Sequence, residues 1–149
     1  MTIGEICNRT VVCATRDITV VEAANLMRQH HIGDLVVVDE SDGRRTPVGI
    51  VTDRDVVVEV VAPGLDAKSI KLGDLLIGHL TAVEERENCA DVVRLMAAKG
   101  VRRMPVVDAA GILVGIVTID DLLPQLATQL AELSELPGRS REHELQARK

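Results

Sequence analysis

The chain carries the stretch VGIVTDRD at residues 48–55 and repeats it, nearly unchanged, as VGIVTIDD at residues 114–121. In both copies an apolar β-branched run predicts a strand, and a threonine followed three residues later by an aspartate predicts the start of a helix. The structural explanation is that Thr52 and Thr118 cap these helices while Asp55 and Asp121 favour the helix dipole. The functional alternative is a nucleotide site, since a helix N-terminus suits a phosphate and a carboxylate accepts hydrogen bonds from a ribose diol. A single copy favours capping, so the choice depends on the rest of the chain.

The repetition extends well beyond this stretch. An offset of 69 residues aligns Gly4 with Gly73, Leu26 with Leu95, Met27 with Met96, and VVD at residues 37–39 with VVD at residues 106–108. The offset falls to 66 after a turn, ESDGRR at residues 40–45, which the second copy shortens to AAG at residues 109–111. Two copies of one fold tolerate an insertion that is confined to a turn, so the chain reads as a tandem repeat.

Each copy predicts the same elements in the same order. Thr19 and Glu22 form a capping box that opens a helix ending near His30, and Asn88 with Asp91 opens its counterpart. The buried strands at residues 35–38 and 104–107 each pair with the strand that follows, as antiparallel hairpins. We therefore predict a mixed α/β (α+β) fold of two β-α-β-β-α units, packed pseudo-symmetrically through their small sheets.

The predicted boundaries follow from these patterns. Residues 1–62 form repeat 1, residues 63–123 form repeat 2 with its leading linker, and residues 124–149 form a C-terminal tail. In the tail, Leu126, Leu130 and Leu133 recur at helical spacing up to Pro137. The charged residues beyond Gly138 lack a core pattern and are expected to be disordered.

Composition excludes several classes of partner. The chain has 17 Lys and Arg against 23 Asp and Glu, a net charge of −6, so no general field attracts nucleic acid or an anionic membrane. Phe, Tyr and Trp are absent, so unpaired bases cannot stack on aromatic rings, and a bound base must lie between aliphatic side chains. The sequence shows no secretory leader and no run of membrane-spanning length. Three cysteines at unrelated spacings indicate reduced core residues and a cytoplasmic location.

The order and duplication of these elements resemble the CBS domain (the cystathionine beta-synthase domain), which occurs in tandem pairs called Bateman modules. The resemblance covers residues 3–123. It implies two clefts that hold adenosine-containing ligands, with Thr52 and Thr118 contacting phosphate. It also implies that Asp55 and Asp121 hold the ribose hydroxyls.

A second motif is VRRMP at residues 101–105, between the first helix and the first strand of repeat 2. Two arginines at the C-terminus of a helix complement its dipole whether or not they bind a ligand. In the family, basic residues at this corner reach the phosphate of a ligand whose ribose is held by the other repeat. The resemblance thus adds Arg102, Arg103, Met104 and Pro105 to the candidate nucleotide site. Repeat 1 departs from the pattern, because Gly33 and Asp34 occupy the matching positions, so we expect unequal clefts.

These observations predict a regulatory, signal-transducing module that binds an adenine nucleotide between its repeats. AMP is the expected ligand, with ADP, ATP and NAD as alternatives. No catalytic residues, catalytic cofactor or metal site are expected. The expected assembly is a homodimer, and a separate protein is a candidate target of regulation. Two rival functions stay open: a structural interaction module with empty clefts, and a small nucleotide-processing enzyme.

Overall fold

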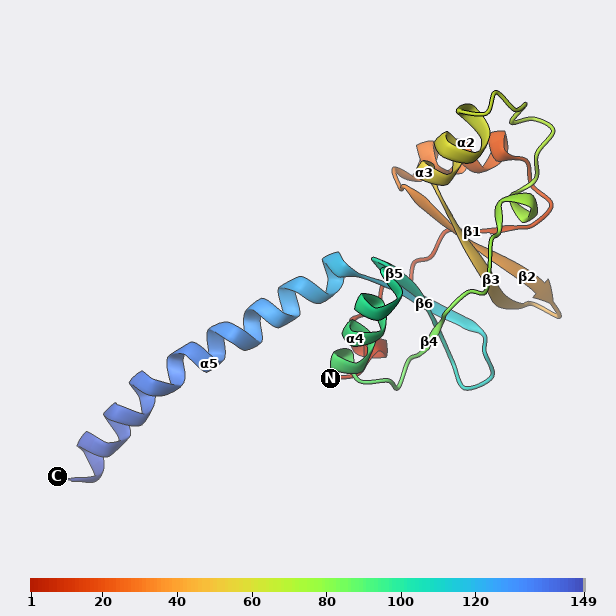
Figure 1. Cartoon of the computed structure of the whole chain (residues 1–149). Coiled ribbons are helices and arrows are strands. Elements are labelled where there is room, and N and C mark those ends of the chain that lie inside the picture. The colour runs from red at the N-terminus through yellow and green to blue at the C-terminus, as the bar shows by residue number, and fades with distance from the viewer. Residues whose placement is uncertain (149) are drawn as a thin grey trace.

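Two three-stranded sheets form the centre of the computed structural model, which describes residues 1–148 (Figure 1). Repeat 1 contains β1 (Cys13–Thr15), α2 (Val20–His30), β2 (Asp34–Ser41), β3 (Arg44–Thr52) and α3 (Asp53–Val56), which continues into a π-helical turn at Val57–Val61. Repeat 2 contains β4 (Val83–Glu84), α4 (Cys89–Lys99), β5 (Arg103–Val107), β6 (Leu113–Thr118) and α5 (Ile119–Ala147). In each sheet the first strand runs parallel to the second, and the second and third form an antiparallel hairpin. The predicted fold class and both hairpins are confirmed.

Local sequence explains where the helices begin. The Thr19 hydroxyl accepts a hydrogen bond from the Glu22 N–H at 3.2 Å, and the Glu22 carboxylate accepts one from the Thr19 N–H at 2.7 Å. Asn88 caps α4 differently, because its side chain accepts from the Ala90 N–H at 2.9 Å. Both helices thus satisfy backbone donors that would otherwise lack partners.

The alternation of side chains along β2 explains the layered core. Leu35 and Val37 point toward the helices of repeat 1, whereas Val36 and Val38 point toward the sheet of repeat 2. On the other side of that interface, Leu113 and Ile116 complete the cluster between the sheets. Because both faces of β2 are buried, the strand reads as a continuous apolar run.

The leading segments of the two repeats are exchanged. Ile3, in helix α1 (Ile3–Ile6), is buried in the core of repeat 2, and the Gly4 N–H donates to the Glu85 carbonyl at 2.7 Å. Leu72, in the 3₁₀ turn Leu72–Leu75, is buried in the core of repeat 1. The two repeats are therefore held together by their own first segments as well as by their sheets.

This exchange explains the glycine of the repeated GIVT motif. A Cβ on Gly115 would lie 2.7 Å from the Cys7 sulfur and 3.0 Å from the Asn8 carbonyl oxygen. A Cβ on Gly49 would collide with the side chain of Leu76, the residue equivalent to Cys7. At Gly115 the crossing segment brings its backbone too close for a Cβ, whereas at Gly49 the close neighbour is the side chain of Leu76, which can move.

Helix α5 extends away from both sheets (Figure 1). Leu122 is its buried residue and belongs to the core of repeat 2, whereas Leu126, Leu130 and Leu133 are 44%, 69% and 62% exposed. The prediction that helical structure ends at Pro137 differs from the structure, in which the helix runs through Pro137 to Ala147. An exposed ion pair between Glu135 and Arg139, with 2.7 Å between the two charged groups, spans this proline on the helix surface. Lys149 lies outside the described residues.

Candidate functional site

A cavity of 610 Å³ opens between the two repeats. Its first wall is the end of β3 with the start of α3, its second is the linker at residues 76–81, and its third is the corner at residues 99–104 between α4 and β5. Segments from both repeats and the linker between them therefore meet in one place.

The structure brings only part of the predicted site together in this cavity. Thr52, Arg102, Arg103 and Met104 line it. The other four candidates lie outside its lining: Asp55, Pro105, Thr118 and Asp121. Pro105 is buried in β5 opposite Ile116. Thr118 and Asp121 lie at the start of α5 and line none of the cavities of 610, 310 and 150 Å³ in the described chain.

Both Thr-x-x-Asp corners are reciprocal helix caps. The Thr52 N–H donates to Asp55 Oδ2 at 2.8 Å, and the Asp55 N–H donates to the Thr52 hydroxyl at 3.2 Å. The equivalent distances between Thr118 and Asp121 are 2.8 and 3.4 Å. The capping explanation therefore holds for both copies, and it leaves one oxygen of each carboxylate for another role.

The first turn of each of these helices is also hydrogen-bonded to the residue just before the second strand of the same repeat. The Asp53 N–H donates to the Gly33 carbonyl, and the Ile119 N–H donates to the Arg102 carbonyl, both at 2.9 Å. Each corner is therefore fixed beside the residues that precede the second strand of its own repeat.

The cavity is basic although the chain as a whole is acidic. Arg54, Lys99, Arg102 and Arg103 line it, together with His79. Among the lining residues that the structure describes, none is acidic. Four cationic side chains around one cavity on a chain of net charge −6 create a local field that favours an anion.

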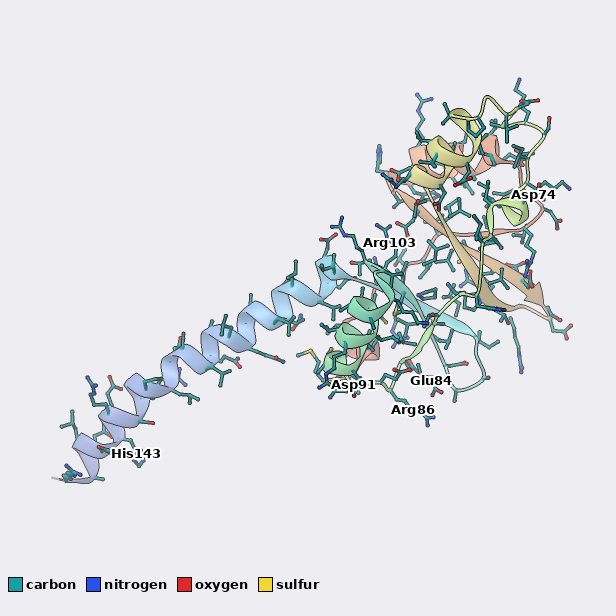
Figure 2. The ribbon with its side chains drawn as sticks, in the orientation of Figure 1. Asp74, Glu84, Arg86, Asp91, Arg103 and His143 are labelled. Carbon is teal, nitrogen blue, oxygen red and sulfur yellow. The ribbon has the colours of Figure 1, made fainter. Side chains whose placement is uncertain are left out.

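One of these cations has a partner from the opposite repeat. Arg103 Nη1 forms an ion pair with Asp34 Oδ1, and the two side chains are 32% and 19% exposed. Figure 2 shows Arg103 near the start of α5, at the junction of the two repeats. Arg103 is the first residue of β5 and Asp34 is the first residue of β2, so equivalent positions of the two repeats contact each other. Sequence reasoning expected Asp34 in the second cleft and did not foresee this pair.

Sequence reasoning also missed three cavity residues. Lys99 and Arg54 are exposed at helix ends, where a lysine or arginine is commonly only solvated, and His79 lies in the linker. The sequence did offer a signal for Lys99. It is the last residue of α4, and Arg103 begins β5 four residues later, so both flank the corner that the motif at residues 101–105 occupies. Nothing in the sequence indicated that the linker at residues 76–81 forms a cavity wall, since its position next to Gly49 depends on the exchange of leading segments.

The described residues show no activated thiol, no grouped metal ligands and no membrane-spanning helix. Burial raises the pKa of the Cys7, Cys13 and Cys89 thiols, which keeps them protonated and weakly nucleophilic. Among residues 1–148, no three His, Cys, Asp or Glu side chains are grouped so that they could hold a metal ion. Within the same residues, no helix combines the length and the apolar character that crossing a membrane requires.

Comparison with known proteins gives a consistent result. The model of the CBS domain family matches residues 3–62 and again residues 72–128. Hypoxic response protein 1 of Mycobacterium tuberculosis is 34% identical over 125 residues, which cover 84% of this chain and 85% of the relative. A crystal structure of hypoxic response protein I, with two coordinated zinc ions, superimposes with a TM-score of 0.72 over 83% of this chain and 98% of the other.

Two further solved structures bear on ligands and assembly. The CBS domain pair of protein MJ0100, in complex with 5'-methylthioadenosine and S-adenosyl-L-methionine, is 25% identical with a TM-score of 0.72, covering 87% of this chain and 98% of that one. A hexameric CBS-CP12 protein from bloom-forming cyanobacteria is 30% identical with a TM-score of 0.72, covering 83% of this chain and 66% of that one. Proteins similar to this chain thus include one that binds adenosine compounds and one that forms oligomers.

Proposed function

The chain belongs to the CBS-domain family, and on that premise we propose that it is a regulatory module whose cavity binds an adenine nucleotide, with AMP as the first candidate. The binding unit is residues 1–123. The observation that carries the proposal is the basic cavity between the repeats. The helix dipole accounts for cations at the C-terminal end of α4 but not for Arg54 at the start of α3 facing the same cavity, whereas an anionic ligand would supply a countercharge for all of them.

The lining suggests how AMP would lie. Its phosphate would contact Arg102 and Arg103, whose guanidinium groups donate charge-assisted and bidentate hydrogen bonds. Its base would lie against Val48, Ile50 and Ile77, the aliphatic surfaces available in a chain without aromatic residues. Ile77 is 85% exposed and lines the cavity, so its apolar surface is available to a bound base.

The role of Asp55 remains a prediction of the family resemblance. Its Oδ2 accepts the Thr52 N–H, so a ribose hydroxyl would bind Oδ1. The neighbour MJ0100 binds adenosine compounds without a phosphate, whereas the cations here favour a phosphorylated ligand. ADP, ATP and NAD share that chemistry and stay as alternatives to AMP.

The output of binding would be a change in shape or assembly that a separate protein senses. A catalytic role lacks support, because the partly buried thiols have raised pKa values and the corner carboxylates act as caps. The three free cysteines suit a reducing compartment, so the cytoplasm is the proposed location.

We also propose a homodimer in which α5 contributes to the interface. Leu123, Leu126, Leu130 and Leu133 repeat at spacings of three and four residues, and all are at least 44% exposed. The helix carries no charged residue from Leu122 to Ala131, so two copies can approach along this stripe without repulsion. Sedimentation at micromolar concentration should give twice 16.1 kDa, and Leu126→Glu/Leu130→Glu should give the monomer. A wild-type monomer would contradict the proposal.

Thermal unfolding with and without ligand tests the proposed function. AMP at 100 times its dissociation constant should stabilise the fold by about 2.7 kcal/mol. ADP, ATP, NAD and adenosine, each measured in the same way, rank the candidates. Absence of a shift with every adenine compound would favour the structural interaction module. Conversion of AMP or ATP to a product, followed by chromatography, would instead favour the nucleotide-processing enzyme.

A further inference from the structure

We infer that Asp34 sets the charge selectivity of the cavity, because its carboxylate holds Arg103 until a strongly anionic ligand takes its place. The inference rests on the proposed function and deepens it. Arg103 lines the cavity, and Asp34, from the opposite repeat, is its partner. The carboxylate is 19% exposed, so water screens the ion pair only partly.

The geometry makes Asp34 a competitor for the ligand. Arg103 reaches the cavity from the first residue of β5, and the nitrogen that meets Asp34 belongs to the same guanidinium group that a phosphate would contact. A ligand phosphate must therefore displace the carboxylate or share the guanidinium with it at close range. Two anions on one cation repel each other, which lowers the affinity for any ligand that uses Arg103.

The competition acts differently on different ligands. A phosphate dianion offers more charge than a carboxylate and can replace it, whereas an uncharged nucleoside cannot. Asp34 therefore lowers the affinity of the cavity for every phosphorylated ligand to some extent and leaves its affinity for adenosine unchanged. Because the pair joins the two repeats, its opening also couples phosphate binding to the contact between the repeats.

The matched control lies on the same strand. Asp39 is also in β2 and also pairs with an arginine, Arg16, with 2.8 Å between Nε and Oδ1. Arg16 lies outside the cavity lining, so Asp39→Asn removes an equal charge and an arginine–aspartate pair, here an exposed one, without freeing a cavity cation.

The test is calorimetric titration of wild type, Asp34→Asn and Asp39→Asn with AMP, adenosine and inorganic pyrophosphate, at about 0.15 M salt. We expect AMP and pyrophosphate to bind about fivefold to tenfold more tightly to Asp34→Asn, as loss of a partly buried competitor implies. Adenosine affinity should stay within about twofold in all three proteins, and Asp39→Asn should match wild type for every ligand. Equal AMP and pyrophosphate affinities in wild type and Asp34→Asn would overturn the inference.

A double-mutant cycle separates this role from a general loss of structure. In an Arg103→Gln background, Asp34→Asn should raise pyrophosphate affinity clearly less than it does with Arg103 present, because only direct repulsion by the unpaired carboxylate remains to be relieved. An unchanged gain in that background would overturn the inference. If pyrophosphate shows the expected pattern while no adenine compound binds any variant, the inference about Asp34 stands and the proposed function fails. If AMP binds wild type and Asp34→Asn equally, the proposed function stands and the inference fails.

Discussion

The strand-to-helix corner of repeat 1 and that of repeat 2 have the same sequence motif and the same cap but different surroundings. At both corners a threonine and an aspartate exchange hydrogen bonds between side chain and backbone. Thr52 borders a cavity that Lys99, Arg102 and Arg103 of the opposite repeat supply with positive charge. Thr118 lies opposite Arg103 in the β5–β6 hairpin, and it lines none of the cavities of 610, 310 and 150 Å³ in the described residues. The positions of repeat 1 that match Arg102 and Arg103 are Gly33 and Asp34, which carry no positive charge.

This difference leads to a proposal about which part of a repeat decides the charge of a cleft. The GIVT motif and its aspartate build the corner and therefore recur in both copies. We propose that the residues between the first helix and the second strand set the charge of the opposite cleft; these are Arg102 and Arg103 in one copy and Gly33 and Asp34 in the other. A duplicated motif thus need not give a duplicated site.

The largest effect is expected from removing a cation from the basic cavity beside Thr52. Arg103→Ala removes a charge-assisted partner of the phosphate and leaves the Asp34 carboxylate beside the cavity without its cation. We expect AMP affinity to fall about 10-fold to 100-fold, as the loss of hydrogen bonds to a charged group implies. Calorimetry measures the change. Arg86→Ala, which removes an exposed arginine that pairs with Glu84, serves as the control and should leave affinity unchanged. Equal affinities in the two variants would return Arg103 to a helix-end role.

A second change tests whether charge alone distinguishes the corners. Gly33→Arg/Asp34→Arg gives repeat 1 the arginines of repeat 2, so the cleft at Thr118 should gain AMP affinity of about tenfold. A Cβ at Gly33 would lie 3.0 Å from Asp53 Oδ2, which a small rotation of that side chain relieves. The number of AMP molecules bound per chain should rise from near one toward two. A stoichiometry that stays near one would show that shape, as well as charge, distinguishes the clefts.

A third comparison separates capping from binding. Asp55→Ala and Asp121→Ala each remove one half of a capping box, so each should lower stability by about 0.5–1 kcal/mol. Only Asp55→Ala should also weaken AMP binding, by a few fold, since only its corner borders the basic cavity. Melting curves and titrations of both variants provide the measurement. A loss of stability without a loss of affinity for Asp55→Ala would leave that residue as a cap.

The smallest expected effect concerns the first helices. The hydrogen bond from the Thr19 backbone N–H lowers the pKa of Glu22 from its ordinary value of 4.5, whereas α4 begins at the uncharged Asn88 side chain. A lowered pKa in the folded state gives stability that is present above about pH 4.5 and is lost as the pH falls below it. Hydrogen-exchange protection of α2 should therefore decrease more than that of α4 between about pH 6 and pH 3.5. Glu22→Gln should remove the difference, and equal losses in the wild-type helices would contradict the explanation.

Local patterns explain why much of the fold could be predicted. Thr19 with Glu22, and the apolar run at residues 35–38, are short-range signals that the structure preserves. The exchange of leading segments could not be predicted, because an apolar pattern shows that Ile3 and Leu72 are buried but not against which sheet. Pro137 misled because a proline inside a helix removes one backbone hydrogen bond and therefore predicts a break, whereas α5 continues through it to Ala147.

The candidate site was predictable only where a local sequence motif marks its residues. Arg102 and Arg103 stand in a motif that the family resemblance identifies, and they do line the cavity. Lys99 and His79 join them only through the fold, and the pair between Arg103 and Asp34 joins residues 69 positions apart. Charge in the sequence is therefore a guide to which groups are available, while their partners depend on tertiary structure.

The most direct test of the central claim is the stoichiometry of AMP binding to the wild-type chain, measured by calorimetric titration at about 0.15 M salt. If the basic cavity beside Thr52 is the functional site, near one AMP should bind tightly per chain, and Arg103→Ala should abolish or strongly weaken that event. Two equal sites per chain, or one site that is indifferent to Arg103→Ala, would contradict the claim that the corner of repeat 2 gives the cavity its function.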